Sequence, residues 1–125
     1  MKILYPDYEK SLVNFSATIL KKFGISSEYS TLSRIDKLLK EEEYKNIVVL
    51  LYDGLGSKII EKHLDKNSFL VKNKMFDITS TVPSTTMAAT TSILSGKTPY
   101  EHGWIGWNMY FKDLDKTITI ARNKI

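Results

Sequence analysis

The most constraining feature of the sequence is a short apolar run, residues 46–52 (NIVVLLY), that ends directly at Asp53 and Gly54. Apolar residues at both odd and even positions are typical of a strand buried on both faces, as in a parallel sheet. A second run, residues 76–82, alternates in polarity and ends at Pro83, so it predicts another strand. Because helical patterns precede and separate these runs, the order of elements predicts an α/β fold with a mostly parallel sheet flanked by helices.

Periodicity and capping residues place the other elements. Helices are expected over residues 8–23, over 32–43, over 57–64 with Ser57 as cap, and from a Ser84 or Thr85 cap to Gly96. After a turn at residues 99–103, residues 104–111 and 117–121 are expected to be extended. No linker or repeat interrupts this order, and 125 residues are the usual length of one domain, so a single domain is expected.

Composition excludes several classes of protein. The chain has no cysteine, which rules out disulfides, thiolate zinc sites, iron–sulfur clusters and a cysteine nucleophile. Its net charge of +4 suits an anionic ligand, but the basic residues are scattered, so no specific nucleic-acid partner is expected. The first ten residues lack the apolar core of a signal peptide, and the long uncharged stretch 78–96 is rich in Ser and Thr. We therefore expect a cytoplasmic protein with no membrane partner.

Asp53 is the first candidate site residue. In open α/β sheets ligands bind at the carboxyl ends of the strands, which is where Asp53 would lie. Its carboxylate is a hard oxygen donor that suits a divalent metal ion, and the glycines that follow, Gly54 and Gly56, allow a sharp turn. The alternative is that Asp53 only caps the next helix.

The second candidate is the segment 82–86 (VPSTT), which opens a helix directly after a predicted strand. Free N–H groups and the positive end of the helix dipole favour an anion there. A hydroxyl in this first turn, placed against a metal ion, can attack phosphorus or sulfur. The alternative is ordinary N-capping. If both strand ends meet at one edge of the sheet, Asp53 and this hydroxyl can bind the same ion.

Residues 47–56 (IVVLLYDGLG) and 80–103 (STVPSTTMAATTSILSGKTPYEHG) together resemble the alkaline phosphatase superfamily, and most closely its type I phosphodiesterase/nucleotide pyrophosphatase branch. In that family the aspartate of the Asp-Gly pair binds a metal ion, which implies this role for Asp53. The family's nucleophilic threonine lies ten residues before the glycine that ends its helix. That glycine corresponds to Gly96, so the resemblance implies Thr86 as nucleophile and metal ligand.

The resemblance also implies an activity. Two divalent ions, with zinc as the expected metal, would assist the attack of Thr86 on a phosphodiester or pyrophosphate and give a phosphothreonine intermediate. The substrate would be a small phosphate ester or a nucleotide. Related branches act as phosphomonoesterases, sulfatases or phosphomutases, which remain alternatives. A non-catalytic binding domain of flavodoxin-like architecture is the alternative from another class.

One position departs from the family pattern. Nucleotide pyrophosphatases place an asparagine 21 residues after the nucleophile, where it binds a phosphoryl oxygen. Trp107 occupies this position here, and Asn108 follows it. A one-residue bulge would restore Asn108 to the catalytic site, whereas without it Trp107 would shape the substrate pocket.

The family's remaining metal ligands, several Asp and His residues, come later in its chains, and no Asp or His follows Asp115 here. The resemblance therefore implies that residues 1–125 are the N-terminal part of a single metal-dependent phosphohydrolase domain, with an incomplete alkaline-phosphatase-like fold. We expect such a portion to be inactive by itself and to self-associate through exposed apolar surface.

Overall fold

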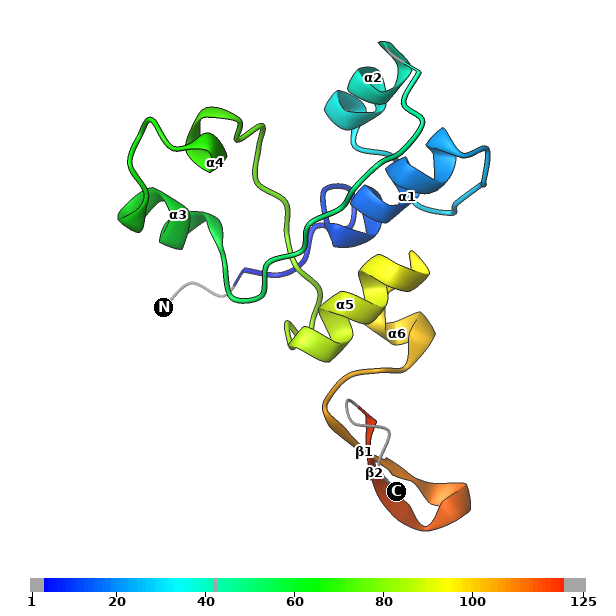
Figure 1. Cartoon of the computed structure of the whole chain (residues 1–125). Coiled ribbons are helices and arrows are strands. Elements are labelled where there is room, and N and C mark those ends of the chain that lie inside the picture. Colours follow the sequence, from blue (N-terminus) through cyan, green and yellow to red (C-terminus); the bar gives the residue numbers. More distant parts are fainter. Residues whose placement is uncertain (1–3, 42, 121–125) are drawn as a thin grey trace. The chain divides into compact units, whose positions relative to one another are not determined.

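The structure is a computed structural model that describes residues 4–41 and 43–120 (Figure 1). The chain divides into two compact units, one drawn from Met1–Glu43 and Ile78–Ile125 and the other from Tyr44–Asp77. The larger unit contains α1 (Leu12–Lys22), α2 (Ser33–Glu41), α5 (Thr86–Ser95), α6 (Pro99–His102), β1 (Asn108–Phe111), the 3-10 helix η1 (Lys112–Leu114) and β2 (Lys116–Thr119). The smaller unit contains α3 (Ser57–His63) and α4 (Phe69–Lys72).

In the larger unit, helix α1 packs against both α2 and α5. The buried apolar residues of this unit are Val13, Ala17, Leu32, Leu39 and Ala88. Nearly all the other buried side chains carry a hydroxyl or amide group: Ser11, Asn14, Ser16, Thr18, Thr81, Ser92 and Thr98. Because a buried polar group is costly unless it is hydrogen-bonded, this small core depends on its hydrogen bonds as well as on apolar packing.

Asn14 is the centre of one buried group of these hydrogen bonds. Its Oδ1 accepts from the backbone N–H of Ser11 at 2.8 Å and from the Ser11 hydroxyl at 2.7 Å. Its Nδ2 donates to the backbone carbonyl and the hydroxyl of Ser30, at 3.0 and 3.1 Å. One fully buried amide therefore fixes the start of α1 and joins it to the segment that precedes α2.

The helices predicted from the sequence are present, with shorter ends. The first begins at Leu12, because Ser11 takes an extended backbone and acts as its N-cap. The third begins at Ser57 itself, and Gly56 occupies the N-cap position instead of the predicted Ser57. Glu42 and Ala121, which belong to two predicted elements, lie outside the described residues. None of the helices in the described ranges is long and apolar enough to span a membrane.

The mostly parallel sheet expected from the sequence is not observed in the described residues. Residues 46–52 form neither helix nor strand, and residues 76–82 make a single parallel bridge, between Thr79 and Ser11. The sheet present is the antiparallel hairpin β1–β2, which pairs Asn108 with Thr119. A strand exists only where a neighbouring strand completes its hydrogen bonds. Among the residues described, residues 46–52 have no strand partner and residues 76–82 are paired only at Thr79, so neither segment forms a strand.

The smaller unit is held by polar contacts around Lys74. The Lys74 ammonium lies 2.7 Å from a Glu61 carboxylate oxygen and 2.9 Å from one of Asp77. Asp77 also accepts a hydrogen bond from the Ser57 hydroxyl at the start of α3. These contacts close the loop that follows α4 onto α3, the helix directly after Asp53.

Candidate functional site

Helix α5 begins and ends where its capping residues dictate. Thr85 has an extended backbone, and its Oγ1 accepts a hydrogen bond from the Ala88 N–H at 3.3 Å. At the other end Gly96 adopts a left-handed conformation with φ of +67°, which glycine tolerates best. Of the two predicted caps, Ser84 and Thr85, the structure shows Thr85, and the predicted stop at Gly96 is confirmed. Thr86 is therefore the first helical residue, half-buried, and its neighbour performs the capping.

The first turn of α5 is suited to an anion. The N–H groups at the start of a helix have no partner within the helix, and the dipole adds partial positive charge there. No acidic residue in this turn opposes that charge. A phosphoryl group at this helix start would thus meet backbone N–H donors.

Asn108 lies in the same unit as Thr86, at the start of β1. Its side chain is exposed, and its Oδ1 accepts a hydrogen bond from the Thr119 hydroxyl at 2.7 Å. Because this bond uses the amide oxygen, the amide nitrogen is the atom suited to donate to a phosphoryl oxygen. Pairing is one-to-one from Asn108 to Phe111. A bulge that moves Asn108 into the family position would therefore have to lie before β1.

A weak contact joins the start of α5 to the segment before β1. The Thr85 hydroxyl donates to the Ile105 carbonyl at 3.5 Å, the long limit for a hydrogen bond. Trp107, which follows, is half exposed. Its carbonyl accepts from the Ile120 N–H at 2.8 Å and extends the hairpin by one pair. The start of α5, the helix of Thr86, therefore contacts the segment that leads to Asn108.

Asp53 belongs to the smaller unit, in the exposed loop before α3. The turn after it depends on Gly54, whose φ of +68° lies in the left-handed region. Since Gly56 is the N-cap of α3, Asp53 does not occupy the cap position that was its alternative role. That Asp53 and Thr86 bind one ion stays a prediction.

The residues present suit a metal ion only in part. Carboxylate and hydroxyl oxygens are suitable donors for divalent cations. A structural or catalytic zinc ion, however, is usually four-coordinate. Within residues 4–41 and 43–120, no three His, Cys, Asp or Glu side chains gather in a group that could hold a metal. A zinc ion bound by Asp53 and Thr86 would therefore require further ligands.

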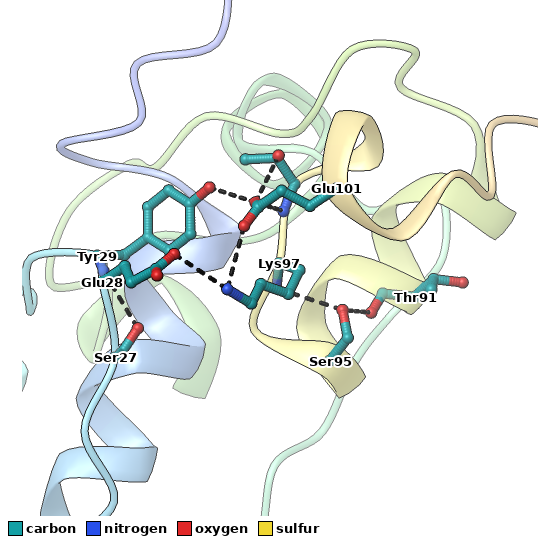
Figure 2. A network of polar contacts seen from close by, with 8 residues as sticks. Ser27, Glu28, Tyr29, Thr91, Ser95, Lys97 and Glu101 are labelled. Carbon is teal, nitrogen blue, oxygen red and sulfur yellow. Dashed lines mark hydrogen bonds and ion pairs between the residues drawn. The ribbon is translucent and has the colours of Figure 1, made fainter.

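A charged network lies beyond the C-terminal end of α5 (Figure 2). Glu101 accepts hydrogen bonds from the Thr98 N–H and hydroxyl, at 2.7 and 2.6 Å, and from the Tyr29 hydroxyl. The Lys97 ammonium lies 3.1 Å from both a Glu101 and a Glu28 oxygen. Partial burial raises the pKa of Glu101, but hydrogen bonds from Thr98, Tyr29 and Lys97 outweigh it and lower the pKa from 4.5 to about 2.

Sequence reasoning missed this network and a second contact, 2.9 Å long, between Ser92 Oγ and His102 Nε2. Tyr29 and Glu101 are 72 residues apart, and no periodic pattern predicts such a pair. The only local signal was the Thr98–Glu101 spacing, which matches a capping box at the start of α6.

Comparison with known families supports the resemblance seen in the sequence. Residues 47–124 match the type I phosphodiesterase / nucleotide pyrophosphatase family, which is more than half of the chain. The chain therefore belongs to this family. Neither a curated protein nor a solved structure gives a significant match. The matched segment includes Asp53, Thr86 and Asn108, whereas α1 and α2 lie before it.

Proposed function

We propose that the protein hydrolyses phosphodiester or pyrophosphate bonds in a metal-dependent reaction, with Thr86 as the nucleophile. The observation that carries this proposal is the division of roles at the start of α5. Thr85 supplies the capping hydroxyl, so Thr86 stands at the first helical position, in the turn whose backbone N–H groups favour an anion. Membership of a phosphodiesterase and pyrophosphatase family supports the reaction type.

In this reaction the Thr86 hydroxyl gives its proton to water and Oγ1 attacks the phosphorus atom. A new oxygen–phosphorus bond forms while the bond to the leaving oxygen breaks, and the leaving oxygen takes up a proton. Water then attacks the phosphothreonine, which releases the phosphate group and restores the Thr86 hydroxyl. The amides of α5 and the Asn108 side-chain N–H would bind the non-bridging oxygens. Two divalent ions, zinc by resemblance and with Asp53 and Thr86 among their ligands, would supply positive charge that favours the alkoxide and the leaving oxygen.

Residues 1–125 would form the N-terminal part of one alkaline-phosphatase-like domain, in which other parts of the protein supply the remaining ligands. The substrate would be a small phosphate ester or a nucleotide, because the positive end of a helix dipole favours an anion. We further propose that the protein acts in the cytoplasm.

The test uses the complete gene product that carries this sequence, assayed with zinc and bis(4-nitrophenyl) phosphate. Thr86→Ala should lower turnover at least about 1,000-fold, since the nucleophile is lost, and Thr86→Ser should retain part of it. Thr90→Ala is the matched control, because Thr90 lies one turn later on α5 and is likewise half-buried. It should keep turnover within about twofold of the wild type.

Full turnover by folded Thr86→Ala would overturn the nucleophile assignment. Mass spectrometry of acid-quenched reactions should find phosphate on Thr86 and on no other residue. Parallel assays with 4-nitrophenyl phosphate and 4-nitrophenyl sulfate separate the alternatives. If 4-nitrophenyl phosphate were turned over faster than the diester, the enzyme would be a phosphomonoesterase. If 4-nitrophenyl sulfate were turned over faster, it would be a sulfatase.

A further inference from the structure

His102, the last residue of α6, uses both of its ring nitrogens. Its Nδ1 accepts a hydrogen bond from the Trp104 backbone N–H at 3.0 Å. Its Nε2 lies 2.9 Å from Oγ of Ser92, a fully buried residue on α5. Because Nδ1 is an acceptor, the neutral ring must carry its proton on Nε2. His102 therefore donates to Ser92 and accepts from Trp104.

The surroundings of the ring favour this neutral form. Burial lowers the pKa of His102 below its ordinary value of 6.5, although hydrogen bonding to the Ala88 backbone and the negative charge of Glu101 act in the opposite direction. A protonated ring would carry a proton on Nδ1 and place it against the Trp104 N–H, where two donors face each other. Neutral His102 is thus the form that fits both contacts.

The contacts of His102 link two parts of the candidate site. On α5 the ring contacts Ser92, which lies one helical turn after Ala88. Ala88 lies in the first turn, where its N–H donates to the capping hydroxyl of Thr85. On the other side, the Trp104 N–H belongs to the segment that leads to Asn108, and Thr85 makes its weak contact with Ile105 in the same segment.

We propose that His102 is a positioning residue for the Thr86 nucleophile, and that its neutral ring holds the start of α5 in a fixed place relative to the segment leading to Asn108. The inference rests on the proposed function of Thr86. The proposed role of His102 is to keep the Thr86 hydroxyl in position, because a misplacement of about 1 Å in an active site can lower turnover by about 100-fold.

The first experiment is structural and needs no activity. In the 125-residue chain, the ring ¹⁵N signals of His102 should show a proton on Nε2 and none on Nδ1 at pH 7.5. His102→Leu should shift the backbone amide signals of Thr86 and Ile105. His63→Leu is the matched control, because His63 is exposed on α3 in the smaller unit, and it should leave both signals in place.

The second experiment measures turnover by the complete gene product per folded molecule. His102→Leu should lower kcat about 10–100-fold with KM changed less than about threefold, because placement and not binding is lost. His102→Gln retains a donor towards Ser92 and should recover part of kcat. If His102→Leu does not fold, Ser92→Ala removes one partner of the same contact and should lower kcat in the same direction.

Three results would overturn the proposal: a proton on Nδ1, an unmoved Thr86 amide signal in His102→Leu, or an unchanged kcat per folded molecule. A purely structural histidine would lower the melting temperature and leave this kcat unchanged. Failure of the proposed function is recognised separately, since Thr86→Ala would then keep full turnover whatever the state of His102.

Discussion

Ser16 on α1 donates its hydroxyl hydrogen bond to the backbone carbonyl of Ile93 on α5 at 2.7 Å. This contact joins a helix that lies before the family match to the helix that opens with Thr86. The same face of α1 contacts the end of α5, where a Cβ atom at Gly96 would lie 3.2 Å from Leu20 Cδ1. Residues outside the matched segment thus support the candidate nucleophile helix along its last turn.

Gly96→Ala tests this packing. Alanine in the left-handed conformation is strained, so the free energy of unfolding should fall by about 1–2 kcal/mol, and the Leu20 methyl must also move. Gly24→Ala is the matched control, because Gly24 has a φ of +75° but open space around its Cβ position. Denaturant titration followed by tryptophan fluorescence reports on the larger unit, which holds Trp104 and Trp107. Equal losses in both variants would show that the Leu20 contact contributes nothing.

Asn14→Ala tests the buried amide. It removes the partner of the Ser11 N–H and hydroxyl and of two Ser30 oxygens, and we expect a loss of about 2–3 kcal/mol because buried polar groups are left unsatisfied. Asn67→Ala, at an exposed turn, should change stability by less than about 0.5 kcal/mol. Denaturant titration followed by far-UV circular dichroism measures both variants, because helices of both units contribute to that signal. A loss at Asn14 no larger than at Asn67 would contradict the role of the network.

Local chemistry made α5 predictable from the sequence. The cap at Thr85 and the stop at Gly96 depend on backbone conformations that neighbouring residues determine, so both were correct. The prediction of strands over residues 46–52 and 76–82 was wrong for the described structure. A strand depends on a partner strand, which the local sequence pattern does not reveal. Residue type indicated burial of the first run, whereas Val48 and Leu50 are exposed.

The candidate site was predictable in part for the same reason. Thr86 follows from its place at a helix start and from the family spacing, which a single sequence carries. The His102–Ser92 contact does not, because it depends on how α6 turns back onto α5 after Gly96. Likewise, Asn14 on α1 meets Ser30, which lies 16 residues later in the sequence, and no periodicity encodes this pair.

Because Glu101 is hydrogen-bonded in the folded state, the free energy of unfolding should depend on pH in the acidic range. Its folded-state pKa is about 2, below the ordinary value of 4.5, so the folded state favours the carboxylate and the unfolded state binds the proton more readily. The stability that Glu101 contributes is therefore fully present above pH 4.5 and is lost as the pH falls towards 2. In Glu101→Gln, unfolding titrations between pH 5 and 2.5 should show a flatter loss of stability than the wild type.

Glu28→Gln provides the control for this pH series. Glu28 contacts the same Lys97 ammonium at 3.1 Å, but its side chain is 79% exposed and meets neither the Tyr29 nor the Thr98 hydroxyl. Its removal should leave the acid dependence close to that of the wild type, since exposed ion pairs contribute little. If Glu101→Gln lost stability with falling pH as steeply as the wild type, the hydrogen bonds to Glu101 would not stabilise its ionised carboxylate.

Exposed apolar residues predict self-association of the 125-residue chain. Val48 and Leu50 are 80% and 71% exposed and belong to one continuous apolar run. Such a patch favours contact between copies. Sedimentation velocity should find dimers or larger species, and Val48→Lys combined with Leu50→Lys should reduce them. Leu94→Lys, at an equally exposed leucine on α5, is the control and should not. A monomer at all concentrations would refute the prediction.

The isolated 125-residue chain should neither bind two zinc ions tightly nor hydrolyse phosphodiesters. Among the residues that the structure describes, Asp53 and Thr86 are the proposed ligands and no cluster of three metal-binding side chains exists, whereas zinc usually takes four ligands. Without the positive charge of a bound metal ion, the Thr86 hydroxyl stays protonated at neutral pH and is a poor nucleophile.

Isothermal titration with zinc and an assay on bis(4-nitrophenyl) phosphate measure the two properties, with Asp53→Asn as the matched variant. Submicromolar binding of two ions with turnover, both lost in Asp53→Asn, would place the complete site within these residues and refute the view that further ligands are needed.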